Sequence, residues 1–191
     1  FLLWGTGLFT LSLILLIIDF KGILRSYQYR IQLEIFTNKT EFKTGDLLFR
    51  RGNSFESLMV MMLDRKGEYS HVGVILQDND TTWVVHMEPG RDSEGKETIR
   101  KEQISLFLAP EKSTQFALYR INKHKMPDLI KVKEYIEFAI INQYSFDHNY
   151  DSDNDDKLYC SELIRNAYLD GGVDLIRGEY DFFNVFSINV P

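Results

Sequence analysis

The chain lacks several features that would assign it to a common functional class. A single cysteine cannot form an internal disulfide, so cysteine content gives no indication of the redox compartment. Lysines and arginines are scattered through a chain of formal charge -6, and the absence of a basic stripe argues against nucleic acid as a partner. No glycine-rich cradle precedes an expected helix, which argues against phosphate chemistry.

Charged residues are also missing from 1–18, and this apolar run ends sharply at Asp19 and Lys21. At about 1.5 Å per helical residue, the run reaches the lower limit for crossing a hydrocarbon core of roughly 30 Å. No A-x-A-like site follows it, so the pattern favours a membrane anchor over a cleaved signal peptide.

The predicted organisation has three parts. The sequence predicts a transmembrane anchor over residues 1–20, a juxtamembrane linker over 21–38 and one domain over 39–191. About 150 residues are the usual size of a single domain with a substantial core. We therefore expect one N-terminal transmembrane helix followed by one enzyme-sized domain.

Hydrophobic periodicity predicts a mixed domain with an antiparallel centre. Met59, Met61 and Met62 lie at helical spacing and are expected in the core rather than on a surface for hydrophobic substrates. The polar stretch 90–101 is expected to be a loop. The predicted strands and helices cover 46–50, 55–63, 72–76, 83–87, 116–121 and a helix that begins at Pro127-Asp128.

Two distant segments carry the residue types of a thiol active site. His71 lies in an apolar strand segment, and Cys160 follows a polar run at the expected beginning of a helix. An adjacent imidazole and the unpaired N–H groups of a helix N-terminus both favour the thiolate form of cysteine. The pair therefore predicts a cysteine nucleophile and its base, whereas a purely structural cysteine would have no reason to lie there.

Three motifs in order resemble a known family. The segments 45–49 (GDLLF), 69–74 (YSHVGV) and 159–164 (YCSELI) resemble those of the YiiX/YebB-like cysteine hydrolases, circularly permuted relatives of NlpC-type, papain-like enzymes. The resemblance runs from about residue 42 to about residue 172. It implies an α+β, permuted papain-like domain, with a central antiparallel sheet packed against helices, and it assigns Cys160 and His71 to catalysis.

The third catalytic position is expected at the end of the next strand. Alternation places Val84, His86 and Glu88 on one face, from which either polar side chain could reach His71. In the resembled family this position is often an acidic residue, and related permuted enzymes use a second histidine. By spacing His86 occupies it, with Glu88 as the alternative and a solvent-exposed strand-end histidine as the structural interpretation.

Two metal sites can also be drawn from the residue types. The run 151–162 has carboxylates at several positions of an EF-hand loop, but Asp156 stands where that loop needs glycine. His71, His86 and Cys160 could ligate zinc, although no close C-x-x-C or H-x-x-x-H pair supports it and the same residues serve a thiol mechanism. We expect neither a metal nor a cofactor.

The sequence thus predicts a membrane-anchored cysteine hydrolase that cleaves an amide bond. The resemblance implies cell-wall peptides, such as amide links to diaminopimelate, or lipid acyl groups as in the lecithin–retinol acyltransferase branch. A tethered binding module without turnover is the remaining alternative, and the presence of both Cys160 and His71 argues against it. Basic residues after the anchor favour a cytoplasmic domain, whereas a cell-wall substrate favours the periplasmic or extracellular side.

Overall fold

A computed structural model describes most of the chain. The described residues are 2–63, 67–79, 81–90, 97–122, 126–150, 157–176 and 182–189. Side chains are described for these residues except those of 2–13, 15, 182–185 and 187–189.

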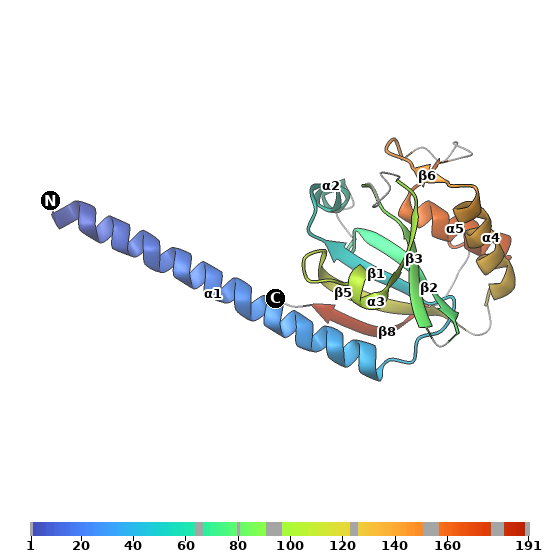
Figure 1. Ribbon diagram of the computed structural model, residues 1–191, viewed down its shortest axis with the longest axis horizontal. Coiled ribbons are helices and arrows are strands. Elements are labelled where there is room, and N and C mark those ends of the chain that lie inside the picture. Colours follow the sequence, from blue (N-terminus) through green and yellow to red (C-terminus); the bar gives the residue numbers. More distant parts are fainter. Residues whose placement is uncertain are drawn as a thin grey trace.

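The domain combines helices with an antiparallel sheet, which confirms the predicted α+β class (Figure 1). The helices are α1 (Leu2–Lys39), α2 (Phe55–Leu63), α3 (Ile104–Phe107), α4 (Leu129–Ile141) and α5 (Cys160–Asp170). The strands are β1 (Leu47–Gly52), β2 (His71–Asp78), β3 (Thr81–Met87), β4 (Ile99–Gln103), β5 (Ser113–Ile121), β6 (Ser145–Phe146), β7 (Lys157–Leu158) and β8 (Phe182–Asn189).

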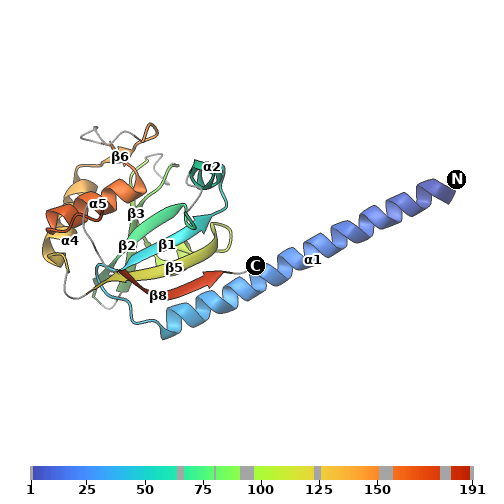
Figure 2. The same ribbon diagram turned by 180° about the vertical axis from the view of Figure 1, so that it is seen from behind.

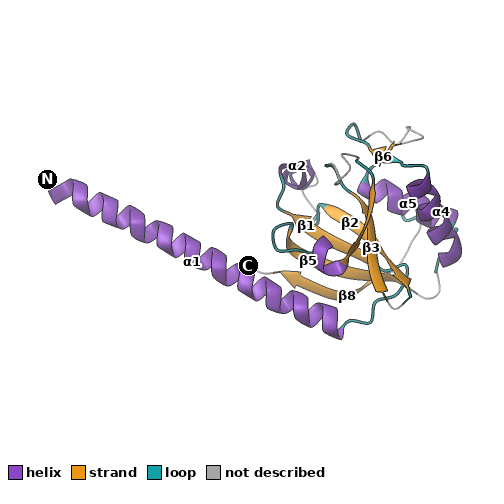
Figure 3. Cartoon of the chain, viewed as in Figure 1, coloured by secondary structure: helices purple, strands orange, loops and turns teal. Residues whose placement is uncertain are grey.

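One antiparallel sheet forms the centre of the domain, in the strand order β4-β3-β2-β1-β5-β8. Figure 3 shows the strands between the helix pair α4 and α5 on one side and α1 with α3 on the other. The hairpin between β2 and β3 turns at Asn79, which has a φ of 45° that asparagine tolerates better than most residues. The predicted hairpin is therefore confirmed.

The first sheet face packs against α4 and α5. Alternate residues of β2 and β3, such as Val72, Val74 and Val85, share a buried cluster with Leu163 and Ile164 of α5. Asp128 caps α4, because its carboxylate accepts from the backbone N–H groups of the first turn. This core fixes α5 against β2, and so it fixes the first residue of α5 relative to the first residue of β2.

The second face packs against α3 and the C-terminal half of α1. Phe36 of α1 is fully buried, with its ring centroid 4.8 Å from that of Phe116 and 4.9 Å from that of Phe186. The Tyr29 hydroxyl donates to the Leu108 carbonyl at 2.9 Å. Residues 21–38, expected as a linker, thus continue α1 along β8, while the N-terminal half of α1 extends beyond the domain (Figure 2).

Two predictions of local structure are wrong. None of the residues of α2 is buried, and Met59 and Met62 are 41% and 63% exposed. A nine-residue helix that is apolar on all sides has no single face that its sequence can assign to the core. The end of the predicted loop 90–101 belongs to β4, an edge strand whose largely polar sequence resembles a loop.

Within the part of the chain whose side chains are described, no helix is long and apolar enough to cross a bilayer. The predicted transmembrane anchor over 1–20 is therefore unsupported by these residues. Most of the side chains of that segment lie outside the described ones.

Candidate active site

Cys160 is the first residue of α5, at the end of the helix that points to the sheet. The preceding residue, Tyr159, is extended, and its side chain does not cap the N–H groups of the first turn. The thiol interacts with the backbone N–H groups of Val72 and Ser161. Because Val72 follows His71 in β2, this contact places the sulfur beside the histidine strand.

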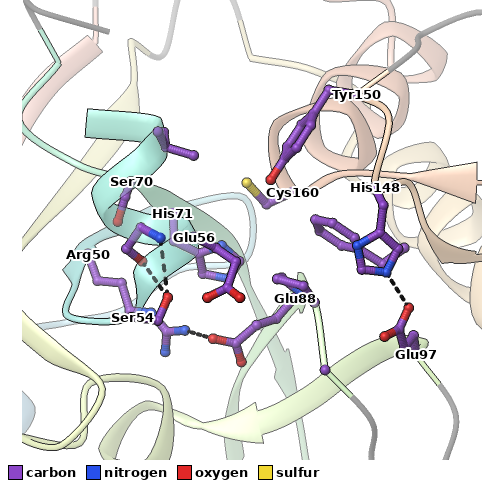
Figure 4. Close-up of a pocket in the computed structure, with 15 residues that line it drawn as sticks. Arg50, Ser54, Glu56, Ser70, His71, Glu88, Glu97, His148, Tyr150 and Cys160 are labelled. Atoms are coloured by element: carbon purple, nitrogen blue, oxygen red, sulfur yellow. Dashed lines mark hydrogen bonds and ion pairs between the residues drawn. The ribbon is translucent and has the colours of Figure 1, made fainter. Parts of the chain in front are cut away.

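His71 and Cys160 line one cavity of about 320 Å³ (Figure 4). The structure therefore brings together the two residues that the sequence pairs. Their elements meet because β2 begins where α5 begins, and the core between β2 and α5 holds the two ends in register.

His86 lies behind His71 and contacts it directly. The Nε2 atom of His71 and the Nδ1 atom of His86 are 2.8 Å apart, and the two rings are nearly perpendicular at 88°. Gly73 leaves room for this approach, because a Cβ atom there would lie 3.2 Å from that of His86. His86 is fully buried, so the interpretation as a solvent-exposed strand-end histidine is wrong.

Glu102 of β4 continues the chain of hydrogen bonds and is absent from the sequence-based candidates. Its Oε1 atom lies 3.0 Å from His86 Nε2, and its Oε2 atom lies 3.3 Å from the ammonium of Lys112. Burial raises the pKa of the Glu102 carboxyl, but the hydrogen bond with His86 and the charge of Lys112 outweigh it and lower the pKa to about 2. Glu102 is therefore ionised at any ordinary pH.

The ionised carboxylate determines the proton positions along this chain. A carboxylate only accepts, so His86 donates from Nε2, and because burial lowers the pKa of His86 and favours its neutral form, its Nδ1 atom accepts. His71 must then donate from Nε2 to His86, which leaves its Nδ1 atom as a hydrogen-bond acceptor. The network therefore assigns one defined neutral tautomer to each ring, with an unprotonated nitrogen on His71.

Glu88, the alternative third member, has different partners. It forms ion pairs with Arg50 and with Arg100, the latter at 3.3 Å. Arg50 is a second residue that sequence analysis missed: its side chain is 4% exposed, and its guanidinium carbon lies 4.5 Å from the ring centroid of Phe107. The Phe107 ring in turn stacks on His71. Arg50 and Glu88 therefore support the site through Phe107 and are not the hydrogen-bond partner of the imidazole.

Burial determines the protonation state of the reactive pair. Burial lowers the pKa of His71 well below its ordinary value, and the neighbouring His86 and Arg50 lower it further. Burial also raises the pKa of the Cys160 thiol, against the opposing effect of the N–H groups of Val72 and Ser161. Both shifts favour the neutral thiol and imidazole over the thiolate and imidazolium, and they oppose the effect expected from the helix N-terminus.

The rest of the cavity lining combines carboxylates with apolar side chains such as Val60 and Phe146. Figure 4 shows Glu56 and Glu88 in the cavity, with the Glu88 carboxylate paired to Arg50, and Tyr150 beside the sulfur. His148 and Glu97 pair across its rim at 2.6 Å. The predicted calcium run falls largely on 151–156, which lie outside the described residues, and within the described part of the chain no group of three or more His, Cys, Asp and Glu side chains could hold a metal ion.

Comparisons with known proteins agree with this geometry. A solved structure described as the metalloprotein YiiX from Escherichia coli O157:H7 matches with a TM-score of 0.55 and 18% sequence identity, over 70% of this chain and 68% of that chain, which supports a shared fold. A search of curated proteins finds no match. A family model described as permuted papain-like amidase, YaeF/YiiX, C92 family, matches residues 41–184. The chain therefore belongs to this family of permuted papain-like cysteine amidases and peptidases, as its motifs predicted.

Proposed function

We propose that this protein hydrolyses an amide bond by nucleophilic catalysis, with Cys160 as nucleophile, His71 as base and His86 as the residue that orients the base. One observation carries the proposal: a helix-terminal thiol and a histidine of fixed tautomer line the same cavity. Family membership supports the reaction class, an amide hydrolysis.

The acylation step uses the tautomer that the buried network assigns. His71 Nδ1 takes the thiol proton of Cys160 as the sulfur attacks the substrate carbonyl, so a C–S bond forms and the carbonyl oxygen becomes an oxyanion. The N–H groups of the first turn of α5 are suited to stabilise this oxyanion, because the N-cap residue Tyr159 does not cap them with its side chain. The C–N bond then breaks, and the His71 proton leaves with the amine.

The deacylation step reverses the roles. A water molecule gives a proton to His71 Nδ1 as its oxygen attacks the thioester, and the C–S bond breaks to return the thiol and release the acid. In both steps His71 becomes positively charged for a time. Its Nε2–H bond to His86, and through His86 to the Glu102 carboxylate, stabilises that charge.

The substrate is proposed to be a peptide of the cell wall, with a lipid acyl group as the alternative that the family resemblance implies. The cavity supports the peptide, because the Glu56 carboxylate and the ion pairs of Glu88 and Glu97 line it and suit a substrate with polar groups. We also propose membrane attachment through the uncharged run 1–18, which is tested by whether the full chain sediments with phospholipid vesicles.

A parallel digestion tests the reaction and the substrate class together. The full chain should release peptide or amino-acid products from purified peptidoglycan fragments, and Cys160→Ser should release none while it keeps the native circular dichroism spectrum. Products are detected by mass. Release of fatty acid from phospholipids without peptide cleavage would contradict the peptide proposal, and equal activity of the serine variant would contradict the nucleophile.

Substitutions along the hydrogen-bonded chain test its role. His86→Ala should lower turnover by about 10²-fold, because His71 loses the group that fixes its tautomer. Glu102→Gln should lower it by about tenfold, because a neutral acceptor replaces a charged one. Glu88→Gln should lower turnover less than His86→Ala, because the Glu88 carboxylate does not contact either imidazole. Turnover is compared at matched folded fraction, and native turnover of His86→Ala would remove His86 from the mechanism.

The pH dependence tests the neutral pair. Activity requires an unprotonated His71, and its lowered pKa should keep kcat/KM on its plateau at pH values below 6.5, the ordinary pKa of histidine. Because the Arg50 charge opposes protonation of His71, Arg50→Met should move the acid limb upward by about one pH unit, whereas Arg50→Lys should leave it near its original position. An acid limb at the same pH in Arg50→Met and Arg50→Lys would contradict this electrostatic account.

A further inference from the structure

A second, apolar groove lies on the sheet face that packs against α4 and α5. Its volume is about 320 Å³, and it is lined by Leu47, Phe49, Tyr69 and Tyr119. Leu47 and Phe49 lie on the side of β1 that faces the α4 and α5 core, and α5 packs over β2 and β3 rather than over β5. The groove is therefore a part of this face that the helices leave open.

The walls of the groove are held in place by one another. The Phe49 ring centroid lies 5.8 Å from that of Tyr69 and 5.5 Å from that of Tyr119, the latter ring at an angle of 85°. The Tyr69 hydroxyl interacts with the side chains of Tyr119 and of the buried Gln115. A groove with fixed aromatic walls needs little reorganisation to accept an apolar group.

The groove borders the reactive thiol. Phe49 lies directly opposite Val72 in the β1–β2 pair, and the Val72 N–H group is the one that interacts with the Cys160 sulfur. Tyr69 precedes His71 by two residues. On the other face of β1, Arg50 lines the cavity that contains His71 and Cys160, so the two binding spaces lie on either side of the same strand.

We propose that this groove is a substrate subsite for one large apolar side chain, aromatic by preference, next to the scissile amide. This inference rests on the proposed amide hydrolysis and not on the cell-wall substrate, because the stem peptides of the cell wall carry no aromatic side chain. Three aromatic rings around a space at the lower limit of ligand pockets suit one ring in edge-to-face contact. The groove thereby recognises a peptide that is apolar on one side of the scissile bond and polar on the other.

Binding to a protein that cannot turn over tests the groove by itself. Cys160→Ala protein is titrated with N-acetyl-phenylalanine amide, N-acetyl-alanine amide and octanamide, followed by NMR chemical shifts. The phenylalanine amide should bind at least about tenfold more tightly than the alanine amide. Equal binding of these two amides, or tighter binding of octanamide, would overturn the proposal, and the latter would indicate an acyl chain as the occupant.

Matched variants connect this preference to the groove. Tyr119→Ala should abolish it, and Tyr69→Leu should reduce it if the first variant folds poorly. Phe138→Ala removes an aromatic side chain that is 54% exposed on α4, outside both binding spaces, and should keep the preference. Preserved preference in both groove variants would contradict the assignment.

Turnover separates this inference from the proposed function. Peptides that differ only in glycine, alanine or phenylalanine beside the scissile amide are digested with the unaltered protein. Cleavage of all of them at equal kcat/KM would contradict the subsite and leave the hydrolase intact. Selective binding of the phenylalanine amide without cleavage of any peptide would contradict the hydrolase and leave the subsite intact.

Discussion

The hydrogen-bonded chain from His71 through His86 to Glu102 is the interaction on which the rest of the site depends. Two imidazoles are buried within one sheet, and burial of polar groups without partners costs about 1–3 kcal/mol each. The ionised carboxylate of Glu102 satisfies the outer ring, and that ring satisfies the inner one. In a buried site such a chain also strengthens electrostatically, so the same bonds that make burial tolerable orient the proposed base.

The fold supplies the space and the surroundings for this chain. Gly73 leaves the gap through which the His86 ring reaches His71, and Phe107 covers both rings. Arg50 packs under Phe107 and binds Glu88, so a buried cation lies close to the imidazole and disfavours its protonation. Strand register therefore positions His86, Glu102 and Arg50 around His71, α3 supplies Phe107, and α5 adds the thiol from the other face.

The sequence predicted the parts of the site that have a strong local pattern. Cys160 follows a polar run at a helix start, His71 lies in an apolar strand, and the alternation of β3 directed His86 toward it. Glu102 was missed because an edge strand exposes one side to solvent and its polar residues resemble a loop. Its signal is the register that places Glu102 opposite Val84 and Arg100 opposite His86, which only the folded sheet defines.

The sequence also could not predict how opposing contributions to a pKa or to burial balance. A helix N-terminus favours a lowered pKa of the Cys160 thiol, whereas burial raises that pKa, and the extent of burial depends on the whole packed site. The exposure of Met59 and Met62 has the same origin, because a short apolar helix does not specify by pattern which face it buries. Local patterns thus predicted residue identities and elements, while desolvation and orientation required the tertiary structure.

The tautomers of the two buried histidines test the central claim most directly. Long-range ¹H–¹⁵N correlation spectra of the imidazole nitrogens at pH 7, assigned with His71→Gln and His86→Gln variants, distinguish a protonated Nδ1 atom from a protonated Nε2 atom. The account predicts that both rings are neutral and carry their proton on Nε2, so that His71 Nδ1 is free of a proton. A charged His71, or a His71 protonated on Nδ1 alone, would contradict it.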